Sequence, residues 1–164
     1  MTQTLNKLRY IELLKKDGGL ESKNSSFDKE NRMEYRELLS YGVILYNQII
    51  YNRRHDYISL IEKYVTNEID SFLLRLQFFK IQREDRRIKK DIEKNFERLY
   101  TVFIDSNSGE FSLLITDIFD ACEALKSNSE SEKAYGITEL QFYFTLKLKN
   151  YKRTYSMQAK KIIS

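Results

Sequence analysis

The chain has 164 residues, with 28 basic and 24 acidic side chains, a formal net charge of +4, one Cys and one His. This length suits one folding domain with a short appendage. The single Cys excludes an intrachain disulfide and a Cys-based zinc cage, and the single His excludes most metal sites and the usual base of Ser or Cys nucleophiles.

The sequence offers no targeting or membrane signal. No apolar run approaches the roughly 18 to 20 residues that cross a bilayer, and the charges in residues 1–20 are too closely spaced for a secretory signal. Ile, Lys, Asn, Tyr and Phe, which have A/T-rich codons, are abundant, as in an A/T-rich bacterial, plasmid or organelle genome. We therefore expect a cytoplasmic protein, or one of the plastid stroma if it is organelle-encoded.

The first predicted helix covers residues 4–16 and ends at Gly18 and Gly19. Its apolar side is expected to hold Leu5, Leu8, Ile11 and either Leu13 or Leu14. Residues 20–31 are polar and Ser-rich, which predicts a linker, and we expect the first 26 residues to pack loosely. We divide the chain into a short helix with a linker (1–31), a helical bundle domain (32–155) and a basic tail (156–164).

A second helix is expected over residues 32–52, with Gly42 at a close helix contact or a kink. Its inward residues are predicted to be Tyr35, Leu38, Leu39, Ile44 or Leu45, and Ile49. Asp56 is predicted to cap a third helix, which carries an apolar stripe of Ile58, Ile61 and Val65. We expect that helix to end in a turn at Asn67, because Asn tolerates the left-handed conformation.

The fourth helix, residues 70–87, is rich in Phe and Leu and is predicted to be central. The charged run 83–94 continues into a fifth helix, which carries Ile92, Phe96, Leu99 or Tyr100, and Phe103. Residues 105–109 then break the chain. Residues 110–125 form the clearest amphipathic helix, whose apolar face holds Phe111, Leu114, Ile115, Ile118, Phe119, Cys122 and Leu125.

A last helix is expected from Thr138 to Lys152, after a polar loop over residues 126–136. Its apolar side holds Leu140, Tyr143 or Phe144, and Leu146 or Leu148. Helical spacing prevails and no segment alternates like a strand, with residues 142–144 the nearest exception. We predict an all-α fold, an antiparallel bundle of about six helices.

Charge is unevenly distributed along the chain. Residues 105–132 hold seven acids and one base, whereas residues 133–164 hold seven bases and one acid. A patch of one sign steers a partner of opposite charge, although acids on a helix face are also its ordinary solvated side. The candidate partner-binding acidic surface is Asp117, Asp120, Glu123, Glu130 and Glu132.

Basic residues give a second candidate surface, for nucleic acid. The candidate contacts are Arg83, Arg86, Arg87, Lys89, Lys90, Lys152 and Arg153. Tyr151 and Tyr155 beside the last two could stack on bases. Glu84 and Asp91 stand at helical spacing in the first cluster, where they are expected to neutralise it.

Nothing in the sequence indicates catalysis. Carboxylate pairs such as Asp117 with Asp120 are expected on a solvated helix side, which does not suit them to act as a catalytic acid and base. We expect His55 at the surface near a helix start and Cys122 in the core. Phosphate-binding glycine loops and metal motifs are absent, so we predict no enzyme activity, no cofactor and no metal.

Three segments resemble the colicin D immunity-like proteins of bacteria. Residues 57–69 (YISLIEKYVTNEI) resemble that family's opening helix and "G-E-I" turn, with Asn67 in place of the turn glycine. Residues 118–125 (IFDACEAL) resemble its "LFxxVDAY" helix, and residues 135–139 (YGITE) its "Y-D-I-D-E" segment before the last helix. The resemblance covers roughly residues 57–150.

The resemblance implies a small helical antitoxin that blocks a tRNA-cleaving toxin with an acidic surface imitating RNA phosphates. The expected partner is then a basic nuclease. Two alternatives stay open. One is a structural or assembly subunit of a larger protein complex, organellar if the gene is organelle-encoded, that uses the same scaffold. The other is a basic RNA-associated helical protein.

Overall fold

The computed structural model describes residues 5–17, 31–124 and 141–153, with only the backbone described for residues 122–124. These residues form helices and contain no strand, which confirms the all-α class. The antiparallel arrangement of neighbouring helices stays a prediction. No helix in the described ranges combines the length and the apolar character needed to cross a bilayer.

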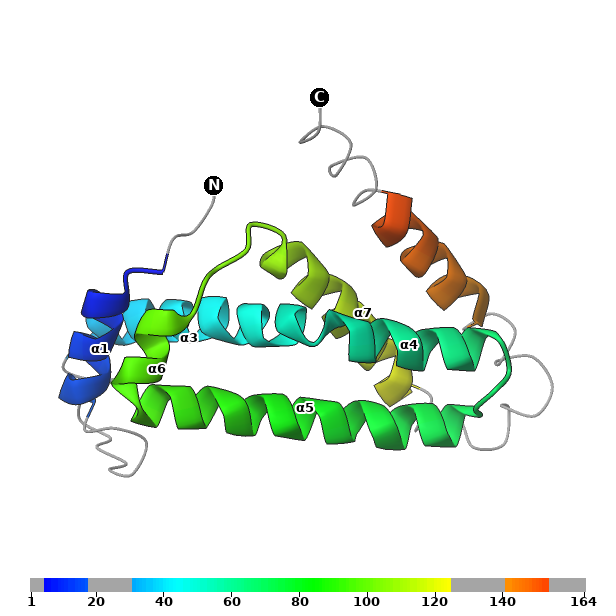
Figure 1. Cartoon of the computed structure of the whole chain (residues 1–164), viewed down its shortest axis with the longest axis horizontal. Helices are drawn as coiled ribbons and strands as arrows, with labels where there is room; N and C mark the ends of the chain where they lie inside the picture. The colour runs from blue at the N-terminus through cyan, green and yellow to red at the C-terminus, as the bar shows by residue number, and fades with distance from the viewer. Residues whose placement is uncertain (1–4, 18–30, 125–140, 154–164) are drawn as a thin grey trace. The chain divides into compact units, whose positions relative to one another are not determined.

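The helices are labelled in Figure 1. The chain divides into two compact units. Unit 1 contains Met1–Asn52 and Gln82–Gly109, and unit 2 contains Arg53–Ile81 and Glu110–Ser164. Each unit therefore combines two stretches that are distant in sequence, and each is described here by itself.

Unit 1 is built from α1 (Lys7–Lys16), α3 (Arg32–Asn52), the second half of α5 (Ser71–Lys94) and α6 (Phe96–Thr101). Helix α1 begins because the Asn6 side chain accepts a hydrogen bond from the Arg9 amide at 3.1 Å. It contacts α3 and α6. The guanidinium of Arg9 binds both Glu34 and Glu37 of α3 at 3.0 Å, which ties the two helices together on their polar side.

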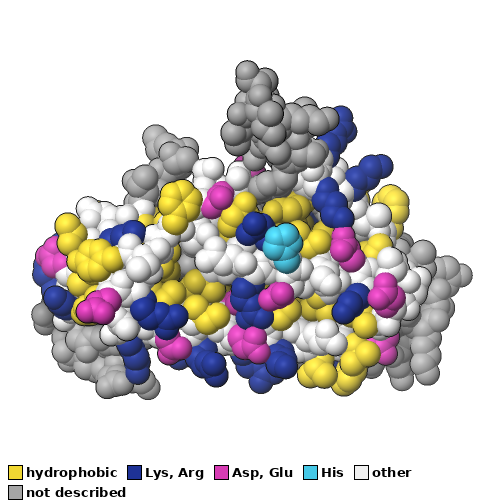
Figure 2. Space-filling model, in the orientation of Figure 1, with side chains coloured by type: hydrophobic (Ala, Val, Ile, Leu, Met, Phe, Trp, Pro, Cys, Tyr) yellow, Lys and Arg dark blue, Asp and Glu magenta, His cyan; other side chains and the backbone are white. Residues whose placement is uncertain are grey.

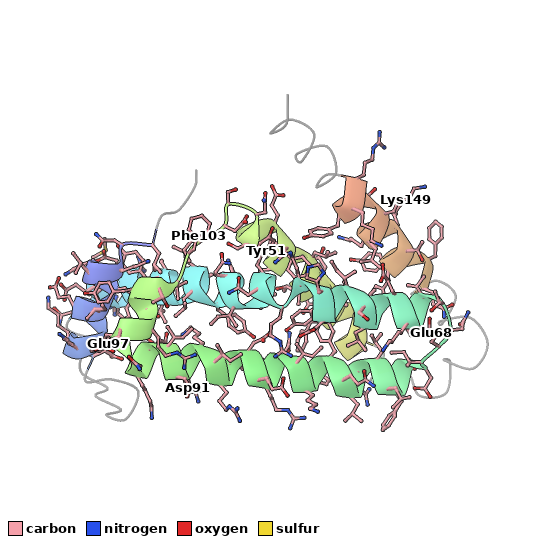
Figure 3. All side chains as sticks on the ribbon, viewed as in Figure 1. Tyr51, Glu68, Asp91, Glu97, Phe103 and Lys149 are labelled. Carbon is pink, nitrogen blue, oxygen red and sulfur yellow. The ribbon has the colours of Figure 1, made fainter. Side chains whose placement is uncertain are left out.

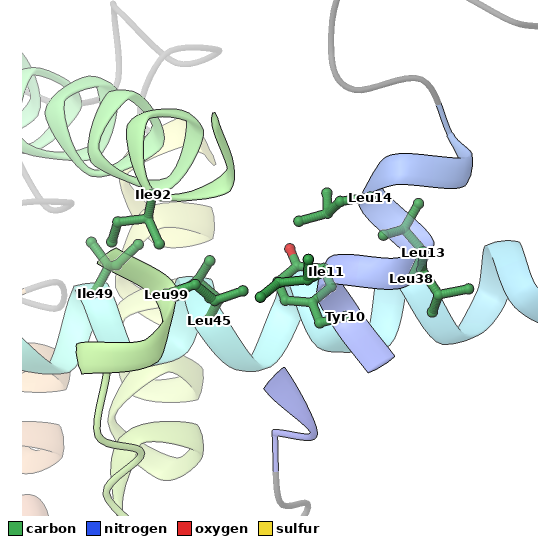
Figure 4. Packing of buried hydrophobic residues seen from close by; sticks show 9 residues of the cluster. All are labelled: Tyr10, Ile11, Leu13, Leu14, Leu38, Leu45, Ile49, Ile92 and Leu99. Carbon is green, nitrogen blue, oxygen red and sulfur yellow. The ribbon is translucent and has the colours of Figure 1, made fainter. Parts of the chain in front are cut away.

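Helix α1 is part of the core of unit 1, so the expected loose packing of the first 26 residues is wrong for this helix. Tyr10 and Leu13 are fully buried, and they pack with Leu38 and Leu45 of α3 (Figure 4). Leu8, expected on the apolar side, is 70% exposed. The side of α1 that carries Tyr10 is therefore the buried one, because burying the Tyr10 ring removes more apolar surface from water than burying Leu8 would.

Helix α3 has the predicted bounds, and Gly42 marks the predicted close contact. A Cβ at Gly42 would lie 3.3 Å from Nζ of Lys89 and 3.4 Å from the hydroxyl of Tyr10. Ile44 and Leu45 are both buried, whereas Leu39, expected inside, is 52% exposed. The glycine thus makes room for polar groups from α1 and α5.

Helix α4 (Arg54–Val65) opens unit 2, and Asp56 does not cap it as predicted. The N-cap position is Arg53, and Asp56 lies in the first turn, where it binds the Arg53 guanidinium at 3.1 Å. The buried face is Tyr57, Leu60, Ile61 and Tyr64, in place of the predicted stripe through Ile58 and Val65. Asn67 has φ of 61°, which confirms the predicted left-handed turn.

Helix α5 is one helix of 24 residues, whereas the sequence predicted a fourth helix ending near residue 87. The Asp70 side chain caps its start by accepting from the Leu73 amide at 2.8 Å. It ends at Lys94, and the next residue, Asn95, caps α6. Leu74 and Phe78 are buried, but Phe72 and Leu76 are exposed, so only one side of this helix is enclosed.

Helix α7 (Ser108–Ala124) has the predicted apolar face, since Phe111, Leu114, Ile115 and Ile118 are buried. Phe103, placed in the preceding stripe by the sequence, is instead exposed. A further helix spans residues 141–153, including the segment 142–144 that came nearest to a strand pattern.

Aromatic packing anchors the helix of residues 141–153 in unit 2. Of its alternative apolar positions, Phe144 and Leu148 are the buried ones. Phe144 packs edge-on against Tyr64 of α4, and Tyr151 packs against Phe111 of α7. Several predicted features lie wholly or almost wholly outside the described residues. They are the linker over 20–31, the loop over 126–136, the cap at Thr138, the apolar positions Leu125 and Leu140, and the basic tail.

Candidate functional site

The acidic side of α7 is the first surface that the sequence predicted. Asp120 is exposed, as is Glu110, on the side of α7 away from buried Phe111 and Ile118. Glu123 lies on the α7 backbone, but its side chain is outside the described residues, as are Glu130 and Glu132 entirely. Of the five predicted acids, the structure therefore describes the side chains of Asp117 and Asp120.

Asp117, in the middle of this side, already forms an ion pair with Lys147. Its Oδ2 accepts from Nζ of Lys147 at 2.5 Å, and the Asp117 side chain is 44% exposed. This hydrogen bond to Asp117 raises the pKa of Lys147. A half-exposed ion pair of this kind contributes little stability, so it can open when another cation competes for the carboxylate.

A basic face on α5 is the second predicted surface. Five exposed cations fall within about 100° of the helix circumference, namely Arg83, Arg86, Arg87, Lys90 and Lys94. The sequence prediction left Lys94 out, although it follows Lys90 by four residues. Figure 2 shows Lys and Arg side chains with acidic ones between them along the edge that α5 forms.

Of the other predicted nucleic-acid contacts, one lies on α5 outside this basic face and two belong to unit 2. Lys89 is half-buried and forms an ion pair with Glu93. Lys152 and Arg153 belong to unit 2, where Lys152 pairs with Glu62 of α4. Asp91, expected to neutralise the cluster, is exposed on α5, where Figure 3 labels it.

A cleft in unit 1 was missed by the sequence analysis. It has a volume of about 410 Å³ and is lined by residues of α1, α3 and α5. Its charged lining residues are Asp17, Arg86, Lys89 and Glu93, and Oε1 of Glu93 accepts from the Tyr10 hydroxyl at 2.5 Å and from Nζ of Lys89. Lys89 and Glu93 are four residues apart, and this spacing could have predicted that they form an ion pair. It could not have predicted that the pair is buried.

Burial dominates the electrostatics of this glutamate cleft. It raises the pKa of Tyr10 far above its ordinary value, with the negative charge of Glu93 adding to the effect. Tyr46, also in the cleft, has its pKa raised by burial as well. Both phenols are therefore neutral at physiological pH and act as hydrogen-bonding groups.

The described side chains offer no metal site of three or more His, Cys, Asp or Glu. His55 is exposed on the first turn of α4, as predicted, and the side chain of Cys122 lies outside the described residues. Comparison with protein-family models, curated proteins and solved structures finds no match for this chain.

Proposed function

We propose that this chain is a non-catalytic binding protein of the immunity type, which blocks a basic tRNA-cleaving nuclease through the acidic side of α7. One observation carries the proposal: Glu110 and Asp120 are exposed on a helix whose opposite side, Phe111, Ile115 and Ile118, is buried in unit 2. A helix held in this way presents carboxylates at fixed positions, which suits pairing with the Lys and Arg of a nuclease cleft.

The turn at Asn67 supports the scaffold on which this proposal rests. In the family that the sequence resembles, a glycine stands at this position, and here Asn67 has φ of 61°. Glycine is the residue that adopts this left-handed conformation most easily, and Asn is among the few others that tolerate it. The backbone at Asn67 thus has the conformation that a glycine at this position would serve.

The Asp117–Lys147 pair gives the proposal a mechanism for partner exchange. Lys147 occupies the carboxylate that a basic partner would need, at a distance of 2.5 Å. On binding, a Lys or Arg of the partner replaces Lys147, so the carboxylate keeps a cation throughout. The exchange leaves Lys147 without its carboxylate, so Lys147 competes with the incoming cation and lowers the affinity of the complex.

Affinity capture from the source organism, followed by mass spectrometry, tests the proposal. The unaltered chain should retain a basic nuclease, and the double variant Asp120→Lys/Glu123→Lys should lose it while helicity and melting temperature stay nearly unchanged. The control Asp91→Lys reverses an exposed acid on α5, in unit 1. Equal retention by all three proteins would refute the proposal, and recovery of a large assembly without a nuclease would favour the structural-subunit alternative.

The basic face on α5 favours RNA association as a second candidate function. Five exposed cations on one helix side can contact successive phosphates, which makes binding depend steeply on salt. The double variant Arg87→Gln/Lys90→Gln should weaken RNA binding and reduce the slope of log affinity against log salt by about 2. Salt-independent binding, or none, would exclude this function.

A further inference from the structure

The helix of residues 141–153 is apolar on two nearly opposite sides. Phe144 and Leu148 are buried in unit 2, whereas Phe142 is 70% exposed and Leu146 is 47% exposed. At the α-helical rotation of about 100° per residue, the exposed pair and the buried pair are centred about 160° apart. A helix packed on a protein core normally turns its polar side outward, so the exposed Phe142 and Leu146 indicate a second apolar contact.

Cations share the exposed side of this helix with Phe142 and Leu146. Lys149 and Arg153 are exposed and follow Phe142 by seven and eleven residues, which places each within about 20° of it on the helix circumference. Figure 3 labels Lys149 on this helix. The sequence of residues 141–164 contains six Lys or Arg and no Asp or Glu. A partner for this side must therefore accept apolar side chains and carry negative charge beside them.

Acids from other helices of unit 2 compensate part of this positive charge. Lys147 pairs with Asp117 of α7, and Lys152 pairs with Glu62 of α4. Glu62 also lines, together with Lys149 and Lys152, a hollow of about 310 Å³, so the lining of this hollow carries one more cation than anion. An excess of positive charge therefore stays on this part of unit 2 after both ion pairs are formed.

We propose that the exposed side of the helix of residues 141–153 binds the surface of a bilayer that contains anionic phospholipids. Phe142 and Leu146 enter the boundary between head groups and acyl chains, and Lys149 meets the lipid phosphates. Leu146 favours a bilayer over RNA, because bases stack on aromatic rings, whereas acyl chains accept aliphatic and aromatic side chains alike. This surface lies on a different helix from the acidic side of α7, so each proposal can fail without the other.

Co-sedimentation of the full chain with lipid vesicles tests the proposal. Vesicles of phosphatidylcholine with about 30% phosphatidylglycerol should bind the chain at least about tenfold more tightly than vesicles of phosphatidylcholine alone, and added salt should weaken this binding. The double variant Phe142→Ser/Leu146→Ser should bind the anionic vesicles about tenfold more weakly, because it no longer buries apolar surface in the bilayer. Lys149→Gln should weaken the same binding about fivefold.

The chain offers a matched control on α5. Phe72 and Leu76 have the same residue types and spacing, are 62% and 51% exposed and also belong to unit 2, so Phe72→Ser/Leu76→Ser should bind vesicles like the unaltered chain. Unchanged binding by Phe142→Ser/Leu146→Ser would mean that the basic chain adsorbs by charge alone, and equal losses in both double variants would mean unspecific apolar adsorption. Either result, no binding to anionic vesicles, or binding of polyuridylate in place of vesicles would overturn the proposal.

Discussion

Asn67 shows how one residue fixes the end of an element. It adopts a left-handed conformation directly after α4, and its side-chain oxygen accepts from Nε2 of Gln141 at 2.7 Å. The residue therefore serves both the turn and the attachment of the helix formed by residues 141–153. The turn was predictable because few residue types tolerate positive φ, but the bond to Gln141, 74 residues away, was not.

Two substitutions at Asn67 separate these roles. Asn67→Gly loses the hydrogen bond but relieves the backbone, whereas Asn67→Ala loses the bond and keeps an unfavourable φ. We expect Asn67→Ala to be less stable than Asn67→Gly by about 1 kcal/mol, measured by urea denaturation. Equal stability of the two variants would show that the conformation at this position does not matter.

The helices were more predictable from sequence than the sides that they bury. Helix α3 begins and ends at the predicted residues, because its apolar residues recur at helical spacing without a breaker. Helix α1 is apolar on several sides, so spacing alone allowed Leu8 to face inward. The fully buried Tyr10 decides otherwise, through a bond to Glu93 that lies 83 residues further along the chain.

Paired truncations on α1 test its role in the core. Leu13 is fully buried and Leu8 is 70% exposed on the same helix. Leu13→Ala should lower the free energy of unfolding by about 2 to 5 kcal/mol, and Leu8→Ala by less than about 0.5 kcal/mol. Chemical denaturation measures both. Similar losses for the two variants would contradict the packing of α1 described here.

At the scale of the whole chain, the polarised charge of the sequence is only partly reflected in the described surfaces. Asp120 and Glu110 are exposed on α7, but Lys147 neutralises Asp117. The pair could not be predicted, because it depends on how the helix of residues 141–153 packs in unit 2. The glutamate cleft escaped the sequence analysis for the same reason, since its three helices come together only in the folded unit 1.

The most direct measurement is the dissociation constant of the captured nuclease for the unaltered chain, Asp120→Lys, Lys147→Gln and the control Asp91→Lys. Asp120→Lys should weaken binding about tenfold or more, and Lys147→Gln should strengthen it, because Asp117 is then available without competition. Asp91→Lys should bind like the unaltered chain. Identical constants for all four proteins would contradict recognition through the acidic side of α7.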